Sequence, residues 1–136
     1  MTRKNTGKAS QQEFEVRFRG HVIRVPDAAD LTGLNGGRPV ADFPKPSDYL
    51  AIDKRGIQFA EVKSSQNATS FPYGNIEKGQ RAAATLCALA GAMYFFYLHN
   101  LNTREWHLLT AAEFVADIKA GKGSRKWTEI PKHNWF

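Results

Sequence analysis

The chain has 136 residues, a length that suits one domain with a single hydrophobic core. Hydrophobic residues make up 42% of it and charged residues 24%, which is typical of a globular protein and excludes a disordered one. Nineteen Lys and Arg against thirteen Asp and Glu give a net charge of +6. This charge favours a protein that binds a polyanion, nucleic acid first, over one whose surface charge only keeps it soluble.

Residues 1–9 predict a flexible basic arm. Ser10 and Glu13 have the spacing of a capping box, so a helix is expected from Ser10 to Gly20, although the alternation in "EFEVRFRG" also fits a strand. The segment "HVIRV" at 21–25 predicts the first strand.

Pro26–Pro46 is rich in Gly, Pro, Asp and Asn and predicts a loop. Two apolar strands follow within residues 46–65, and "SSQNATSFPYG" predicts a second loop. Asn75 is a candidate N-cap for a helix over residues 76–90.

The apolar run from Ala82 to Leu98 is divided at Gly91, which favours a buried helix and then a buried strand over a membrane span. A further strand is expected in "REWHLLT". Thr110 and Glu113 form a second capping-box pattern, opening a helix that Gly121 ends.

These elements predict a mixed α/β domain with a central sheet over residues 10–122, in the order helix, three strands, helix, strand, strand, helix. Residues 123–136 are expected to form a basic aromatic tail. The N-terminal residues lack the apolar stretch of a secretory signal, and the single Cys87 excludes an internal disulfide. A cytoplasmic protein without a membrane partner is therefore expected.

The two strands within residues 46–65 place charged groups inside apolar alternation. If Ile52 pairs with Ile57 across a four-residue turn, Asp48 faces Glu61, and Lys63 follows on the same side of the sheet. A β-bulge would break this register. The apolar side chains of that face are expected to pack on a helix.

Two opposed carboxylates repel each other unless a cation lies between them, and oxygen ligands of this kind suit Mg²⁺ or Mn²⁺. Lys63 could then reach a metal-bound water or a scissile phosphate, an arrangement typical of hydrolysis. The alternative is that Glu61 and Lys63 form an ordinary solvated ion pair.

The stretches "PSDYLAI", "IQFAEVK" and "TSFPYGNIEKGQ" together resemble the PD-(D/E)xK nuclease superfamily, and more narrowly the RecU-type Holliday junction resolvases. The resemblance covers about Pro46 to Gln80. It implies a restriction-endonuclease-like core of the order αβββαβ, with a central mixed sheet flanked by helices. The order of the predicted elements agrees with that core.

The resemblance also implies roles for individual residues. Asp48 and Glu61 would be ligands of Mg²⁺ (or Mn²⁺) with the Val62 carbonyl as a third, Lys63 would be catalytic, and Gln80 would support the site.

The superfamily often carries an acid in its first helix, for which Glu13 is the candidate and Glu15 its competitor. The loop at Ser70–Pro72 would shape the site. RecU-type enzymes carry a stalk that enters the junction, and here only Pro26–Pro46 could provide a short one, which leaves junction selectivity open.

Structure-selective nucleases contact mainly the DNA backbone. Basic side chains and a hydroxyl group near the site are expected to make these contacts. The expected nucleic-acid contacts are Arg17, Arg19, Arg24, Ser70, Lys78 and Arg81. The leading hypothesis is a homodimeric, metal-dependent, structure-selective DNA endonuclease that resolves four-way junctions by paired symmetric nicks. The alternatives are a restriction-like or repair nuclease on the same core, and a catalytically silent nucleic-acid-binding module.

Overall fold

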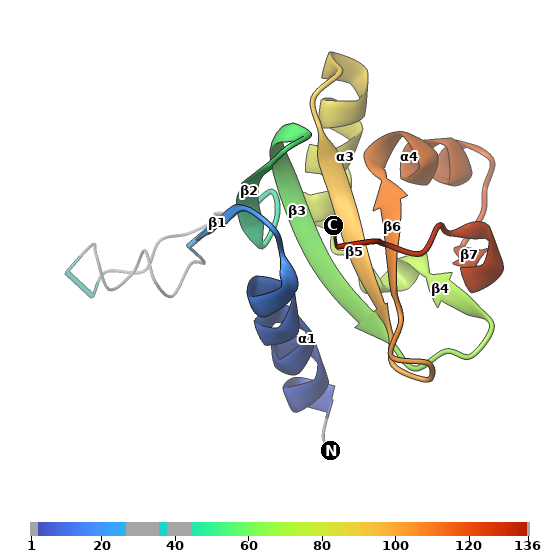
Figure 1. The fold of residues 1–136 in the computed structure, drawn as a ribbon. Coiled ribbons are helices and arrows are strands. Elements are labelled where there is room, and N and C mark those ends of the chain that lie inside the picture. Colours follow the sequence, from blue (N-terminus) through green and yellow to red (C-terminus); the bar gives the residue numbers. More distant parts are fainter. Residues whose placement is uncertain (1–2, 27–35, 38–44, 136) are drawn as a thin grey trace.

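The computed structural model describes residues 3–26, 36–37 and 45–135, so most of the predicted loop Pro26–Pro46 lies outside the described residues. Its elements in chain order are α1 (Arg3–Arg17), β1 (His21–Arg24), β2 (Tyr49–Asp53), β3 (Gly56–Ser65), β4 (Ser70–Pro72), η1 (Tyr73–Asn75), α3 (Lys78–Ala90), β5 (Tyr94–Asn100), β6 (Trp106–Thr110), α4 (Ala111–Lys119), β7 (Ser124–Lys126) and η2 (Trp127–Glu129) (Figure 1).

A five-stranded mixed sheet of order β1-β2-β3-β5-β6 forms the centre of the fold. Only β3 and β5 pair in parallel, and the other neighbours are antiparallel. Helix α1 covers one face, while α3 and α4 cover the other, and β4 pairs with β7 in a small second sheet (Figure 1). The predicted mixed α/β class and the order of the main elements are confirmed.

Two aromatic-rich cores lie on the two faces of the sheet. The core beneath α1 contains Phe14, Phe18, Tyr49, Ala51, Ala60, Val62, Tyr97 and Trp106. The core beneath α3 and α4 contains Phe71, Tyr73, Ile76, Ala84, Tyr94, Phe96, Leu98, Leu109, Ala111, Phe114, Trp127 and Ile130. Burial of so many large side chains is the main favourable contribution to folding.

The capping signals predicted one helix start correctly and another wrongly. At α4 the Glu113 N–H donates to the Thr110 hydroxyl, and the Thr110 N–H donates to Glu113, both at 3.1 Å. Helix α1 instead begins at Arg3, so the predicted start at Ser10 and the flexible arm over residues 3–9 are wrong. The Ser10 hydroxyl is buried and hydrogen-bonds His99 Nδ1 at 2.8 Å, a long-range contact that replaces capping.

Two segments expected to be irregular carry structure. The predicted loop at residues 64–74 contains β4, and helix α3 has Glu77 rather than Asn75 as its N-cap. The predicted tail contains β7 and η2, and its Trp127 lies in the core beneath α3 and α4. Residues 123–130 therefore belong to the folded unit, because this core is incomplete without them.

The predicted register of the β2–β3 hairpin is confirmed by the pairing of Ile52 with Ile57 and of Leu50 with Phe59. The packing of this face is confirmed only in part. Phe59 packs against the core beneath α3, whereas Ile52 is 40% exposed and Ile57 is 64% exposed. The hairpin therefore extends beyond the cover of α3 at its turn end.

Within the part of the chain that the structure describes, no helix combines the length and the apolar character needed to cross a membrane.

We expect Gly20→Ala to destabilise the fold by about 1–3 kcal/mol or more, the range for overpacking. A Cβ atom at this position would lie 2.0 Å from the Ile52 carbonyl oxygen and 2.9 Å from the Phe18 ring, where β1 begins to pair with β2. Gly74→Ala is the matched control, because a Cβ there meets nothing within 4 Å. Urea unfolding of both variants checks the prediction, and equal midpoints would contradict it.

Candidate functional site

A hollow of about 1010 Å³ lies at the end of β3 that is remote from the hairpin turn. Its walls come from α1, the segment just before β2, the second half of β3, the segment after β3 and the start of α3. The hollow, called here the Asp48–Glu61 hollow, is lined by Gly7, Gln11, Lys45, Asp48, Glu61, Val62, Lys63, Ser64, Ser65, Gln66, Asn67, Pro72, Asn75, Glu77, Gln80 and Leu101. It thus brings together Asp48, Glu61, Val62, Lys63 and Gln80 from the sequence-predicted site.

Asp48 and Glu61 are held by reciprocal hydrogen bonds between two neighbouring segments. The Asp48 N–H donates to Glu61 Oε1 at 2.8 Å, and the Val62 N–H donates to Asp48 Oδ2 at 3.1 Å. These bonds continue the contact between β2 and β3 beyond Tyr49, where β2 begins. Each carboxylate therefore has one oxygen oriented by backbone of the opposite segment.

The second oxygen of each carboxylate faces a lysine. Lys63 Nζ lies 3.3 Å from Glu61 Oε2, and Lys45 Nζ lies 3.5 Å from Asp48 Oδ1. Both ammonium groups are largely but not fully buried, since their side chains are 19% and 25% exposed. Two ammonium groups thus lie beside the pair of acids. This indicates a strongly negative electrostatic potential at the acids, in a protein whose net charge is positive.

Burial makes the charge of Glu61 unfavourable. The side chain is 1% exposed, and this burial, followed by the nearby charge of Asp48, raises the pKa of Glu61 to about 8. The ammonium of Lys63 and the N–H of Asp48 oppose this rise in the pKa without overcoming it. The charged form of Glu61 is therefore disfavoured relative to that of an exposed glutamate, and further positive charge near it would favour ionisation.

The oxygen atoms around this pair could hold a divalent cation. In an extended strand the N–H and C=O of one residue face the same side. The Val62 carbonyl therefore faces the same side as its N–H, which binds Asp48. Among the described residues no group of three or more His, Cys, Asp or Glu side chains could bind a metal. A cation here would have two carboxylates and one carbonyl as protein ligands, and water would complete its shell.

Gln80 connects the hollow to the start of α3. Its Oε1 accepts a hydrogen bond from the Glu77 N–H at 3.0 Å, and its side chain is buried. The N-terminus of a helix carries partial positive charge and favours a nearby anion. Gln80 therefore holds in place the end of α3 that borders the hollow.

The candidate acids of the first helix do not line the hollow. Glu13 accepts a hydrogen bond from Trp106 Nε1 at 2.5 Å, and Glu15 accepts one from the Tyr49 hydroxyl at 2.8 Å. Gln11 is the polar side chain of α1 that reaches the hollow, one turn after Gly7. The sequence analysis missed Gln11, although it lies in the predicted helix, because only the charged side chains of that helix were considered as site residues.

None of the predicted nucleic-acid contacts lines the hollow. Arg24 pairs with Glu15 at 3.2 Å, and Arg17 lies 3.5 Å from Glu13. Arg81 donates to the backbone carbonyls of Tyr73 and Ile76. Lys78 and Arg81 border a separate hollow on the outer face of α3. Lys45, which sequence reasoning also missed, is the second cation at the acids.

Comparison with models of protein families and with curated proteins found no match to this chain. Similarity therefore assigns no family, and the interpretation of the hollow rests on its geometry and charge.

We expect Glu61→Gln to stabilise the metal-free protein at pH 8.5 by a few kcal/mol and to change little at pH 5. The folded protein holds the proton of Glu61 up to about pH 8, while an unperturbed glutamate releases it near 4.5, so the free energy of unfolding falls as pH rises between these values. Each unit of pKa difference corresponds to about 1.4 kcal/mol.

Chemical denaturation in EDTA at both pH values measures this effect. Glu129→Gln serves as the control because its side chain is exposed. A difference between Glu61→Gln and the wild type that is the same at both pH values would contradict the prediction.

Proposed function

We propose that this protein is a Mg²⁺-dependent (or Mn²⁺-dependent) DNA endonuclease of the PD-(D/E)xK type that cuts branched DNA. The observation that carries the proposal is the reciprocal hydrogen bonding of Asp48 and Glu61 beside Lys63 in one open hollow. A buried pair of acids weakens a fold, so its presence favours a use for it. A catalytically silent binding module would gain nothing from it.

The residues fit a divalent cation. Asp48 and Glu61 would hold it with the Val62 carbonyl, and the remaining positions would be left to water and a phosphate oxygen. A bound Mg²⁺ supplies Lewis-acid polarisation of the phosphate and lowers the pKa of a bound water. The raised pKa of Glu61 supports this fit, because an added positive charge would favour its ionised form.

The protein's own groups would handle charge and position. The Lys63 ammonium, held 3.3 Å from Glu61, would lie beside the reacting phosphate and stabilise negative charge that develops on its oxygens. Asp48 would keep its orientation through the Val62 N–H. Gln80 and Gln11, which line the hollow from two different helices, would orient the substrate strand.

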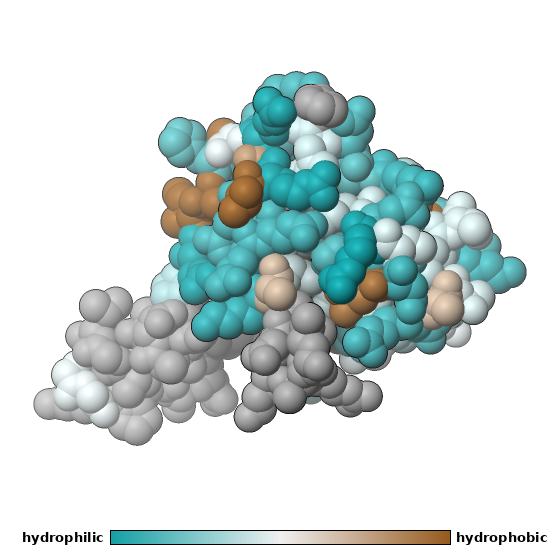
Figure 2. Space-filling view, turned by 60° about the horizontal axis from the view of Figure 1, so that its bottom comes forward, coloured by the Kyte–Doolittle hydropathy of each residue, from teal (hydrophilic) through white to brown (hydrophobic). Residues whose placement is uncertain are grey.

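The substrate class follows from charge and from the kind of contact that charge makes. The net charge of +6 favours DNA, and most of the surface that is coloured by hydropathy in Figure 2 is hydrophilic, with apolar side chains in small patches. Contacts with phosphates carry no sequence information directly, which suits an enzyme that recognises the shape of its DNA. Symmetric nicking of a four-way junction needs two such sites, so we propose that a homodimer is the active form.

We expect Mg²⁺ to raise the thermal unfolding midpoint of the wild type by several degrees at pH 8 and to have little effect on Asp48→Asn. A ligand at about 100 times its Kd adds about 2.7 kcal/mol to the free energy of unfolding. Differential scanning calorimetry with and without MgCl₂ measures this without any DNA. Equal shifts in the wild type and Asp48→Asn would contradict the assignment of Asp48 as a ligand.

We expect Asp48→Asn and Lys63→Ala to lower the cleavage rate at least about 100-fold, while binding of the DNA changes less than tenfold. A positioned acid–base or electrostatic group contributes about 10²–10⁴ to a rate. The assay uses a synthetic four-way junction in Mg²⁺ and in EDTA, with a linear duplex and a flap as comparison substrates.

Glu129→Gln and Lys119→Ala are the matched controls, because both side chains are exposed and neither lines the hollow. Symmetric nicks in the junction alone would support resolution of junctions, and cleavage of the linear duplex would point to a restriction-like or repair nuclease. Binding without cleavage in Mg²⁺ or Mn²⁺ would overturn the proposed activity.

A further inference from the structure

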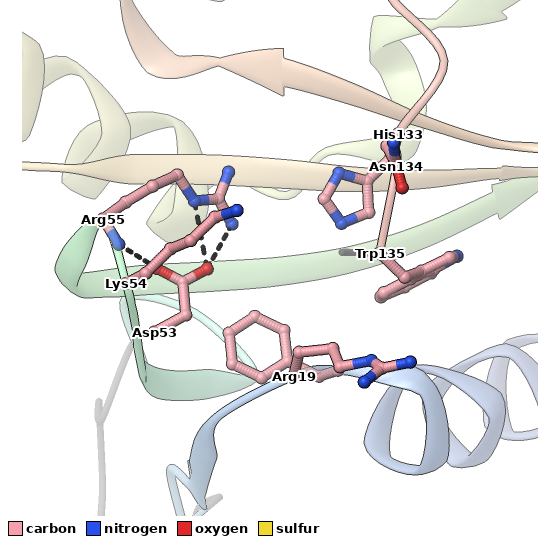
Figure 3. Close-up of a pocket in the computed structure, with 8 residues that line it drawn as sticks. Arg19, Asp53, Lys54, Arg55, His133, Asn134 and Trp135 are labelled. Atoms are coloured by element: carbon pink, nitrogen blue, oxygen red, sulfur yellow. Dashed lines mark hydrogen bonds and ion pairs between the residues drawn. The ribbon is translucent and has the colours of Figure 1, made fainter.

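Two adjoining hollows lie at the hairpin-turn end of β3, opposite the Asp48–Glu61 hollow. Their volumes are about 200 Å³ and 660 Å³, and both are lined by Phe18, Arg19, His133, Asn134 and Trp135. Figure 3 shows the side chains of Arg19, Lys54 and Trp135 around the smaller one, from three different segments of the chain. The two hollows together are called here the basic groove.

Positive charge dominates the lining of the basic groove. Its basic residues are Arg17, Arg19, Lys54, Arg55 and Lys132, and the one acid that lines it is Asp53. Asp53 accepts from the Arg55 guanidinium at 2.6 Å, Lys132 lies 2.6 Å from Glu105, and Arg17 lies 3.5 Å from Glu13. The five cations of the lining and these three acids together still carry a net positive charge. Such a groove attracts a chain of phosphates.

The charge of the basic groove does not depend on histidine at neutral pH. Burial, followed by the nearby charge of Arg55, lowers the pKa of His133 to about 4. The imidazole is therefore neutral between pH 6 and pH 8, and arginine and lysine supply the positive charge over that range.

Trp135 provides an aromatic surface within the same groove. Its ring packs 5.4 Å from Trp106 and 4.5 Å from His133, measured between centroids, so the indole is well held. The side chain remains only partly buried and lines both hollows. The guanidinium of Arg17 lies 5.1 Å from the indole centroid. A held aromatic ring beside cations is the arrangement that binds an unpaired base and its phosphate.

We propose that the basic groove binds a single-stranded segment of nucleic acid, with phosphates at Arg19 and Lys54 and a base against Trp135. A base within a duplex is stacked on its neighbours and cannot reach the indole, which favours a single strand. Lys63 lies seven positions after Gly56 along β3, which corresponds to about 23 Å at 3.3 Å per residue. The groove therefore binds a different phosphate from the one at Asp48 and Glu61.

This inference takes its class of ligand from the proposed function, but its site lies apart from the cleavage site. In a branched substrate the two positions would hold different strands. The groove would then favour substrates that expose unpaired bases near the branch.

The test measures the fluorescence anisotropy of a fluorescein-labelled ten-nucleotide oligo-dT with the full chain in EDTA, where no cleavage occurs. Arg19→Glu combined with Lys54→Glu is the test variant, since both side chains are exposed. Lys119→Glu combined with Lys126→Glu makes the same charge change on exposed residues outside the groove. Calorimetric unfolding of each variant checks that it is folded.

We expect the test variant to bind the oligonucleotide at least about tenfold more weakly than the control variant. The slope of log K against log salt should fall by about 1.4, because each lost phosphate contact on a single strand contributes about 0.7. Trp135→Leu should also weaken binding, by about tenfold, and the wild-type affinity should be the same at pH 6.5 and pH 8.

Equal affinities of the test and control variants would overturn the proposed groove, whatever the outcome for cleavage. If the test variant loses binding to a duplex of the same length but binds oligo-dT as tightly as the control variant does, the assignment to a single strand is overturned. If the protein cuts no DNA and the test variant alone loses oligo-dT, the groove stands and the proposed nuclease activity fails.

Discussion

The reciprocal hydrogen bonds between Asp48 and Glu61 are the constraint on which the site depends. Each carboxylate accepts an N–H of the opposite segment, so neither acid can turn away without leaving a buried donor unsatisfied. The pairing of β2 with β3 thereby holds two like charges close together. Burial of Glu61, followed by the nearby charge of Asp48, raises the pKa of Glu61, and the ammonium of Lys63 opposes this rise only in part.

The mixed sheet explains why the hollow forms at this end of β3. Strand β2 begins at Tyr49, opposite Ala60 of β3, whereas the pairing of β3 with β5 continues beyond this point to Ser65 and Asn100. At the edge of β3 beyond the start of β2, the backbone N–H of Val62 has no strand partner and donates to the carboxylate of Asp48. Helices α1 and α3 then supply Gln11 and Gln80 from opposite faces of the sheet. The site is therefore built at the place where one strand stops and its neighbour continues.

Much of the positive charge in the described residues is used within the fold. Arg81 binds backbone carbonyls, and Arg125 lies 2.7 Å from Glu113 and 3.1 Å from Asp117. The net charge of the sequence therefore indicates the sign of a partner's charge, but it does not identify the surface that binds the partner. The basic groove is recognised only in the tertiary structure, because the C-terminal segment packs against α1 and brings Trp135 against Phe14.

Local patterns in the sequence determined the class of the fold, the order of the main elements, the hairpin register and the encounter of Asp48, Glu61 and Lys63. These features depend on alternation, turn length and capping within a few residues. Tertiary structure alone decided the start of α1, the partner of Glu13, the exposure of Ile57 and the incorporation of Trp127 into the core. Each of these depends on contacts between residues far apart in the chain, whose energies outweigh the local preferences that a sequence pattern records.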